Sequence, residues 1–483
     1  MYLGLDLGTS GLKGLLIDGD QNIIGSATAP LDVTRPHSGW SEQDPAQWIS
    51  ACEAVFDELH RSHPAQLAAV TGIGLSGQMH GATLLDGEHK VLRPCMLWND
   101  TRAHAQANRL DADPCFRQIS GNIVFPGFTA PKVEWVRENE PHLFAKTALI
   151  LLPKDYLRLW LTGHAVSDMS DAAGTSWLDV EKRDWSDDLL SATHLTRDHM
   201  PALAEGSDET GTLRPQLATR WGMQQAVVAG GAGDNAASAM GLGTIEPGAA
   251  FVSLGTSGVL FASNARYSPK PESAVHAFCH AVPETWHQMG VFLSATDSLN
   301  WWAGVTGKDA ATLTATLDDG PAAPEAITFL PYLAGERTPH NDAAIRGAFI
   351  GLDHAHDQPA MTRAALQGVA FAMADSRDAL AEAGTNLTRV MAVGGGTRSA
   401  HWLQTMANTL NLPLDLPAEG DFGAAFGAAR LGLLAAEGKG ADATRICTPP
   451  KIARSFEPDR TMTEAYGEAH RRYKALYHAL KSA

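Results

Sequence analysis

The chain opens with two apolar segments separated by a polar turn that contains glycine. Met1–Leu5 and Leu15–Ile17 are mainly apolar, and between them lies Asp6–Gly14, which reads DLGTSGLKG. Short apolar runs bounded by turn residues are typical of strands. We therefore expect a β-hairpin at the N-terminus. Its glycines allow a sharp turn and a close approach of a ligand to the backbone.

The same hydrophobic and polar pattern occurs a second time. LGTSG stands at Leu7–Gly11 and again at Leu254–Gly258, and both copies lie inside apolar runs that predict strands. A repeated strand–turn–strand unit indicates a duplicated fold. We expect two similar domains, residues 1–246 and 247–483, facing each other across a ligand cleft. The copies differ at one informative position, where Asp6 of the first corresponds to Ser253 of the second.

Strand-like and helix-like segments alternate along the chain, as in an α/β protein. Asp44 and Pro45 are residue types that cap and begin a helix. The small residues of Gly423–Ala436 predict a helix that packs closely on a sheet. Other expected strands are Val70–Leu75, Ala226–Ala229 and Val390–Val393, and other expected helices are Leu151–Gly163, Pro359–Gly384 and a solvated helix after Ser455.

Composition and charge narrow the class of protein. A chain of 483 residues with 44% hydrophobic residues is expected to form two or three domains. The net charge of −17 repels nucleic acid and anionic membranes, so we expect neither as a partner. No apolar run approaches the length that spans a bilayer. The five cysteines are scattered and odd in number, which favours reduced thiols in a cytoplasmic protein.

The first turn has the residue types of a phosphate site. Thr9 and Ser10 place hydroxyl groups beside several backbone N–H groups, an arrangement that suits phosphate oxygens. Asp6 is suited to a divalent cation and Lys13 to a phosphate. The alternative is an ordinary glycine-rich hairpin whose aspartate is satisfied within the protein.

Asp234 is the candidate for proton transfer. It stands in GGAGDNAASAMG, directly after an expected strand and at the start of an expected helix. It could be a helix N-cap. It could also be a carboxylate at the edge of an α/β sheet, where it would accept a proton from a substrate hydroxyl during phosphoryl transfer.

Other glycine-rich and histidine-containing segments give weaker indications. Gly72, Gly74 and Gly77 form GxGxxG, but a loop and a strand follow instead of the helix that a dinucleotide site requires. Gly394–Gly396 precede a helix and suit an anion or a nucleoside lying against backbone. His276 and His280 have the spacing of a metal pair, yet the sequence shows no third ligand near them, so we interpret them as structural.

Many segments together resemble the FGGY family of carbohydrate kinases. They include DLGTSGLK, GWSEQDPAQW, GLSGQMHG, LWND, FTAPKVEW, LLPKDYLRL, SDMSDAAGT, GAGDNAA, SLGTSG, LPYLAGERTPH, RGAFIGL and VGGGTRSAHW. The resemblance extends over nearly the whole chain and is strongest to the members that phosphorylate xylulose. It implies an α/β fold of two ribonuclease-H-like (actin-like ATPase) domains around a catalytic cleft.

The resemblance also implies roles for matched positions. Asp234 would be the general base on the sugar hydroxyl, and Asp6 would hold magnesium. The positions implied for the β- and γ-phosphates of ATP are Gly8, Thr9, Ser10 and Lys13. Those implied on the opposite wall are Gly255 and Thr256, with Gly395 and Gly396 beside the nucleoside. Those implied for the sugar are Gln78, Met79, His80 and Asn235.

The expected reaction is the ATP-dependent phosphorylation of D-xylulose to D-xylulose 5-phosphate, with magnesium as cofactor. A kinase for another ketose or polyol, such as ribulose, is the nearest alternative. An actin/Hsp70-like ATPase or a sugar-sensing regulator is a more distant one. A homodimer is a further expectation. The sequence departs from the glycerol-kinase members at Ala400, where they have an asparagine that meets adenine, so adenine contacts here would come from backbone and apolar groups.

Overall fold

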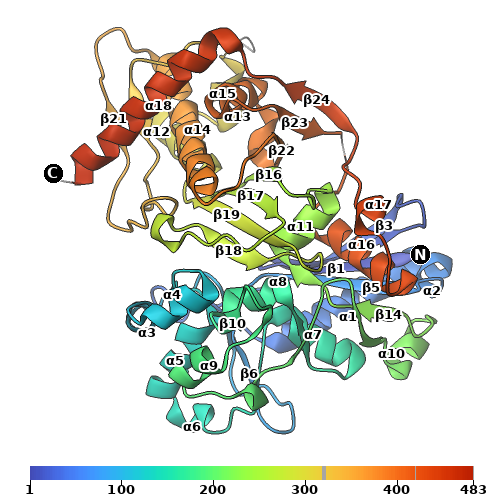
Figure 1. Cartoon of the computed structure of the whole chain (residues 1–483). Helices are drawn as coiled ribbons and strands as arrows, with labels where there is room; N and C mark the ends of the chain where they lie inside the picture. The colour runs from blue at the N-terminus through green and yellow to red at the C-terminus, as the bar shows by residue number, and fades with distance from the viewer. Residues whose placement is uncertain (318–321, 419, 482–483) are drawn as a thin grey trace.

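The computed structural model describes residues 1–317, 322–418 and 420–481 and contains two seven-stranded sheets (Figure 1). The first sheet has the order β13-β14-β5-β1-β2-β3, and β15 also pairs with β5. Its strands are β1 (Tyr2–Leu7), β2 (Gly11–Ile17), β3 (Ile23–Pro30), β5 (Gly72–Gly77), β13 (Glu209–Thr212), β14 (Val227–Ala229) and β15 (Ala232–Gly233).

The second sheet repeats this arrangement in the other half of the chain. Its order is β18-β19-β17-β16-β22-β23-β24. In each sheet an antiparallel hairpin, β1–β2 or β16–β17, is followed by two parallel neighbours, β5 and β14 or β22 and β23. The strands are β16 (Ala249–Leu254), β17 (Gly258–Asn264), β18 (His276–Cys279), β19 (Trp286–Phe292), β22 (Arg389–Val393), β23 (Leu414–Pro417) and β24 (Ile452–Phe456). The repeated α/β fold expected from the two LGTSG turns is confirmed.

Helices and short strands complete the two halves. The helices are α1 (Pro45–Ser62), α2 (Pro64–Ala68), α3 (His104–Asp111), α4 (Pro114–Ser120), α5 (Thr129–Asn139), α6 (Pro141–Phe144), α7 (Pro153–Thr162), α8 (Met169–Ala172), α9 (Asp187–Ala192), α10 (Pro215–Arg220), α11 (Asp234–Leu242), α12 (Thr296–Thr306), α13 (Ala310–Ala315), α14 (Gln358–Glu382), α15 (Ala400–Leu410), α16 (Ala424–Glu437), α17 (Ala443–Ile446) and α18 (Arg460–Lys481). The short strands are β4 (Glu42–Gln43), β6 (Thr83–Leu85), β7 (Cys95–Met96), β8 (Leu149–Leu151), β9 (Val166–Asp168), β10 (Leu178–Asp179), β11 (Asp184–Trp185), β12 (Ala202–Ala204), β20 (Thr328–Leu330) and β21 (Ala348–Ile350).

Local signals fix the ends of several helices as expected. The Asp44 side chain accepts a hydrogen bond from the Ala46 N–H at 2.9 Å, and Pro45 is the first residue of α1. Helix α7 ends at Gly163, which has a left-handed φ of 88°.

Helix α16 connects the two halves of the chain. In sequence it lies between β23 and β24 of the second sheet, but it packs on β1 and β5 of the first (Figure 1). Small residues make this possible, because a Cβ on Gly74 would lie 1.8 Å from the Ala428 carbonyl oxygen and one on Gly4 would lie 1.9 Å from that of Ala425. Gly72 and Gly74 of the GxGxxG string in β5 therefore admit the backbone of α16.

The C-terminal helix is more than a solvated tail. One face of α18 is buried through Tyr466, Tyr473 and Tyr477, which join a core cluster with Tyr332 and Phe371. The expectation of a solvated helix was wrong for this face, because aromatic residues along it cover α14 and the β20 region.

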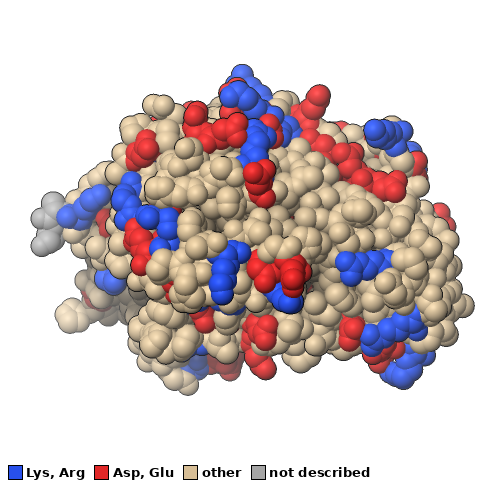
Figure 2. All heavy atoms as spheres, turned by 90° about the horizontal axis from the view of Figure 1, so that it is seen from below, with Lys and Arg blue, Asp and Glu red and all other residues tan. Residues whose placement is uncertain are grey.

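One face of the molecule carries side chains of both charges. On the face shown in Figure 2, Lys and Arg side chains lie interspersed with Asp and Glu. Among the described residues, no helix is both long and apolar enough to cross a membrane.

Replacing Gly74 with alanine tests the packing of α16 on β5. Since the nearest atoms to the new Cβ are backbone, the strand or the helix must shift, and we expect a loss of about 1–3 kcal/mol in the free energy of unfolding. Chemical denaturation measures it. Gly19→Ala is the control, because nothing lies within 4 Å of a Cβ there. Equal stability of the two variants would contradict the close packing.

Candidate active site

The carboxyl ends of three neighbouring parallel strands meet at one edge of the first sheet. Asp6 in β1 lies opposite Ser76 in β5, and Gly233 in β15 lies opposite Gly77. The turn after β1, the Gln78–His80 segment and Asp234 are consequently neighbours. Ligands of open α/β sheets bind at such an edge.

Asp234 is the first residue of α11, and Gly233 is the residue that caps it. The Asp234 Oδ1 accepts hydrogen bonds from the backbone N–H of Asn235 at 2.8 Å and from its Nδ2 at 3.0 Å. Burial, together with the nearby charge of Asp6, raises the pKa of Asp234 to about 6. Because Gly233 holds the N-cap position, Asp234 is the first residue inside α11 and not its cap.

Asp6 has an unused oxygen. Its Oδ1 is buried and, within the described part of the chain, accepts no hydrogen bond. Burial raises the pKa of Asp6, while the Ser76 hydroxyl and the Lys13 ammonium group oppose the rise. Two neighbouring carboxylates, one with a free oxygen, form a donor set that suits a hard divalent cation such as Mg²⁺.

Lys13 lies opposite Asp6 in the β1–β2 hairpin, and its Nζ forms an ion pair with Asp421 Oδ2. Asp421 precedes α16 and was not among the residues expected at the site. The resemblance assigns Lys13 to phosphate, and in this structure its ammonium group is already paired with a carboxylate of the other half of the chain.

The first turn is tied to the expected sugar-binding segment by side chains. The Thr9 hydroxyl donates to Gln78 Oε1 at 3.1 Å and accepts from Trp98 Nε1 at 3.0 Å. Gln78 Nε2 in turn donates to Gln43 Oε1 at 2.9 Å. Gln78 is buried, and these partners occupy both ends of its amide, so it positions the turn. Gly8 closes the turn through its N–H to the Gly11 carbonyl at 3.0 Å, and Ser10 is exposed.

His80 is held in a defined tautomer. Its Nδ1 lies 2.7 Å from the Gly174 carbonyl oxygen, which can only accept, so Nδ1 carries the proton and Nε2 is an acceptor. Burial lowers the pKa of His80 to about 3, which keeps the ring neutral. The ring stacks on Phe128 with 4.4 Å between centroids. Met79 is buried beside Gly233, whose added Cβ would lie 2.9 Å from Met79 Cγ.

The second sheet presents the matching edge. Ser253 in β16 lies opposite Val393 in β22, so the Gly255–Thr256 turn and Gly395–Gly396 follow adjacent parallel strands. Thr296 at the start of α12 fixes that turn, since its Oγ1 donates to the Gly255 carbonyl at 2.7 Å.

A cavity of about 870 Å³ lies beside this second edge. Gly395, Gly396 and Ala400 line one side of it, and apolar residues of α12 and α13 line another. The apolar members are Leu299, Ala310, Ala311, Ala315, Leu317 and Trp402, and the polar ones are Thr296, Asn300, Thr314, Arg398 and Ser399. Its size and its mixture of apolar and polar walls suit a nucleoside.

A smaller cavity of about 200 Å³ joins the two edges. Asn235 and Ser238 of α11 line it from the first half, and Ser253 and Val393 line it from the second sheet. Asp421 also lines this cavity. Residues near the carboxyl ends of β15 in the first sheet and of β16 and β22 in the second therefore line one cavity.

A buried ion cluster behind the Asp234 loop was missed by sequence reasoning. Lys154 Nζ lies 2.5 Å from Asp155, 2.7 Å from Asp168 and 3.1 Å from Asp171, and all four side chains are fully buried. Ser170 Oγ, within the same segment, accepts from the Gly233 N–H at 3.1 Å. Charged residues inside the apolar segments LLPKDYLRL and SDMSDAAGT were the available signal.

The two histidines with metal-like spacing lie among aromatic rings. His276 is on β18, with its ring centroid 5.4 Å from those of Phe125 and Phe278. In the described residues, one group of three or more His, Cys, Asp or Glu side chains lies close enough together to hold a metal ion, namely Asp375, Asp378 and His470, and Lys474 already pairs with Asp378 at 3.1 Å.

Comparisons with known proteins bear on both halves of the chain. The model of the FGGY family of carbohydrate kinases, N-terminal domain, matches residues 1–241, and that of the C-terminal domain matches residues 250–436. The chain is 47% identical to the xylulose kinase of Escherichia coli (strain K12), covering 99% of both chains. It is 46% identical to the xylulose kinase of Klebsiella pneumoniae, covering 100% of this chain and 99% of that one.

A solved structure gives the same picture. The crystal structure of a protein from Brucella ovis described as a xyloylose kinase superposes with a TM-score of 0.98 at 62% identity, over 100% of this chain and 99% of that one. These similarities agree with the two-domain fold of the chain. The chain belongs to the FGGY family of carbohydrate kinases and is a sugar kinase.

Proposed function

We propose that this sugar kinase transfers the γ-phosphoryl group of ATP to the 5-hydroxyl group of D-xylulose. The observation that carries the proposal is the position of Asp234, whose pKa is raised to about 6, beside Asp6 at the sheet edge that also holds Met79 and His80. The similarity to xylulose kinases from Escherichia coli and Klebsiella pneumoniae supports the choice of sugar.

Asp234 acts as the general base in this proposal. The sugar 5-oxygen forms a bond to the γ-phosphorus as the bond from phosphorus to the bridging oxygen of ADP breaks. The hydroxyl proton passes to the Asp234 carboxylate. A base with a pKa near the operating pH is suited to this late proton transfer.

Asp6 is the proposed magnesium residue. Its free, buried Oδ1 and the nearby Asp234 carboxylate fit an oxygen-preferring cation. A bound Mg²⁺ would neutralise charge on the phosphate oxygens. Asp6 itself holds its position by strand pairing with both β2 and β5.

The nucleotide is proposed to lie along the second sheet, with its phosphates directed at the first. Gly8, Thr9, Ser10 and Lys13 contact the phosphates from one side, and Gly255 and Thr256 from the other. Gly395 and Gly396 lie beside the nucleoside, with Ala400 in the wall of that cavity. Lys13 binds phosphate by exchanging its partner Asp421 for the anion.

The proposed sugar-binding residues remain Gln78, Met79, His80 and Asn235. Gln78 contributes indirectly, by accepting a hydrogen bond from the Thr9 hydroxyl. Kinases of other ketoses or polyols, such as ribulose, use the same chemistry and are the alternative that substrate tests must separate. We also propose a cytoplasmic enzyme, on the five unpaired cysteines among the described residues. The domain division at 246 and 247 and the homodimer stay predictions.

A coupled assay of ADP release identifies the acceptor. D-xylulose is expected to give the highest kcat/KM in a panel with D-ribulose, xylitol and D-arabinitol, since the site resembles those of xylulose kinases. Comparable or higher kcat/KM with D-ribulose would replace the proposed sugar, and no acceleration by any of the four would contradict the proposed reaction.

Asp234→Asn tests the general base. We expect a loss of roughly 10²- to 10⁴-fold in kcat with little change in sugar affinity, because the amide cannot accept the proton. Steady-state kinetics and calorimetric titration of the sugar measure the two effects. Asp187→Asn, which alters an exposed acid in the first turn of α9, is the control. Wild-type turnover in Asp234→Asn would remove the role.

Asp6→Asn tests the coupling of the two carboxylates. Asp234 must be deprotonated to act, so kcat/KM for limiting ATP should fall as the pH drops below about 6. Removing the Asp6 charge lowers the pKa of Asp234, so the acidic limb of the pH profile of kcat/KM should move to lower pH. The same variant should need more Mg²⁺ for half-maximal turnover. An unmoved limb with an unchanged Mg²⁺ requirement would contradict the arrangement.

A further inference from the structure

One arginine of the second half is anchored on its own sheet but extends toward the sugar segment of the first. Glu336 Oε1 accepts a hydrogen bond from the Leu293 N–H at 2.9 Å. The Thr338 N–H donates to the Val291 carbonyl oxygen at 2.9 Å. Arg337, between these two anchors, therefore has a fixed backbone position next to β19.

The Arg337 side chain crosses to the first half of the chain. Its guanidinium carbon lies 4.7 Å from the centre of the Phe125 ring. Phe125 packs edge-on against Phe128 at 5.6 Å, and Phe128 stacks on His80 at 4.4 Å. An unbroken series of ring contacts thus connects Arg337 with the proposed sugar residue His80.

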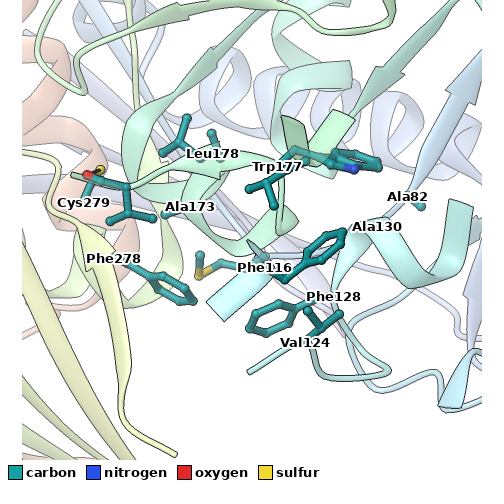
Figure 3. Close-up of a cluster of buried hydrophobic side chains, with 14 of the residues drawn as sticks. Ala82, Phe116, Val124, Phe128, Ala130, Ala173, Trp177, Leu178, Phe278 and Cys279 are labelled. Atoms are coloured by element: carbon teal, nitrogen blue, oxygen red, sulfur yellow. Dashed lines mark hydrogen bonds between the residues drawn. The ribbon is translucent and has the colours of Figure 1, made fainter. Parts of the chain in front are cut away.

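The two halves are firmly packed at this place. Asn122 bonds to the main chain of Ala277 in both directions, each at 2.9 Å. Phe128 and Phe278 lie 6.2 Å apart, and Figure 3 shows Phe278 of β18 facing the same group of buried side chains as Phe128, Phe116 and Val124. Arg337 is therefore held against the first half by a built interface.

The positive charge of Arg337 has no compensating partner. Among the described residues, none accepts a hydrogen bond from its guanidinium group or forms an ion pair with it. The adjacent Glu336 does not offset it, because burial raises the pKa of that carboxyl to about 8. Burial lowers the pKa of Arg337 as well. The Arg337 side chain is half-buried and its guanidinium nitrogens reach solvent, so its five donors are open to an acceptor on a ligand.

The two groups offer opposite hydrogen-bonding functions. His80 presents Nε2 as an acceptor, and Arg337 presents donors alone. A hydroxyl group next to a carbonyl group matches this pair, since the hydroxyl donates and the carbonyl oxygen accepts. A 2-ketopentose with a free 5-hydroxyl has that unit at its other end, because ring closure through the 5-oxygen would consume both the hydroxyl and the carbonyl.

We propose that Arg337 is a substrate-binding residue that donates to the carbonyl oxygen of an open-chain ketose, whose neighbouring hydroxyl donates to His80. This inference rests on the proposed sugar kinase function and names the substrate class of the same site. A polyol carries a hydroxyl in place of the carbonyl. That hydroxyl brings a proton that finds no acceptor on Arg337, so the pair selects ketoses against polyols.

Arg337→Met keeps the length of the side chain and removes its donors. We expect kcat/KM for D-xylulose to fall roughly 10- to 100-fold, mainly through KM. For xylitol and D-arabinitol, kcat/KM should fall much less. The ratio of kcat/KM for the ketose to kcat/KM for the polyol therefore decreases. KM for ATP should stay near its wild-type value. Arg337→Lys should recover part of the ratio, since it restores one charged donor.

Arg346→Met is the matched control from the same loop, since that arginine is exposed and, among the residues that the structure describes, donates hydrogen bonds to the Ala343 and Ile345 carbonyls alone. It should leave the ratio unchanged. Thermal unfolding checks that each variant is folded. If Arg337→Met does not fold, the ratio is measured with Arg337→Lys. The inhibition of D-xylulose phosphorylation by xylitol in the wild-type enzyme then gives the relative affinity for the polyol. An unchanged ratio in the folded Arg337 variants, or wild-type binding of xylitol as tight as that of D-xylulose, would overturn the inference.

The outcomes separate this inference from the proposed function. If no sugar accelerates ADP release by the wild-type enzyme, the proposed function fails. Calorimetric titration of D-xylulose and xylitol into wild-type and Arg337→Met protein then still tests the ketose preference. If D-xylulose is phosphorylated but the Arg337 variants keep the wild-type ratio, the inference alone fails.

Discussion

Two carboxylates held close together at the edge of a sheet are the constraint around which the site is arranged. The pairing of β1 and β15 with β5 places Asp6 and the Asp234 loop side by side. Burial, and after it the charge of Asp6, raises the pKa of Asp234. Like charges in such a position are stable only with compensation. Lys13 supplies part of it, and the proposed cation would supply more.

The buried cluster behind the site keeps the Asp234 loop in place. Burial alone would lower the pKa of Lys154, but three surrounding carboxylates raise it, so the lysine stays charged. Ser170 reaches the Gly233 N–H from this cluster, and Arg158 donates to the Ala229 carbonyl at 2.5 Å. The loop is thereby fixed on both sides of Gly231, whose left-handed φ is 77°. A base that must meet a hydroxyl group with good alignment needs such support.

How far the sequence could be interpreted depended on the range of each interaction. The two hairpins, the cap at Asp44 and the glycine that ends α7 are local, so the residues themselves predict them. The packing of α16 on β5 is not local, and small residues indicate close contact without naming the sheet. Asp421 and Arg337 were missed as neighbours of the site for the same reason. Each meets its partner only because separate segments fold together.

The division of work between the halves follows from where these distant contacts lie. The large cavity lies beside the second sheet, whereas the carboxylates and His80 belong to the first half. The proposed nucleotide and sugar therefore bind to different halves of the chain. They meet at the smaller cavity, which residues of both halves line. Among the side chains that cross that boundary, two carry opposite charge close to the site, Asp421 toward Lys13 and Arg337 toward Phe125. Phosphate binding in the proposed mechanism frees Asp421, and a ketose occupies Arg337. Each ligand would thus alter a contact between the halves, which couples the binding of one substrate to the placement of the other.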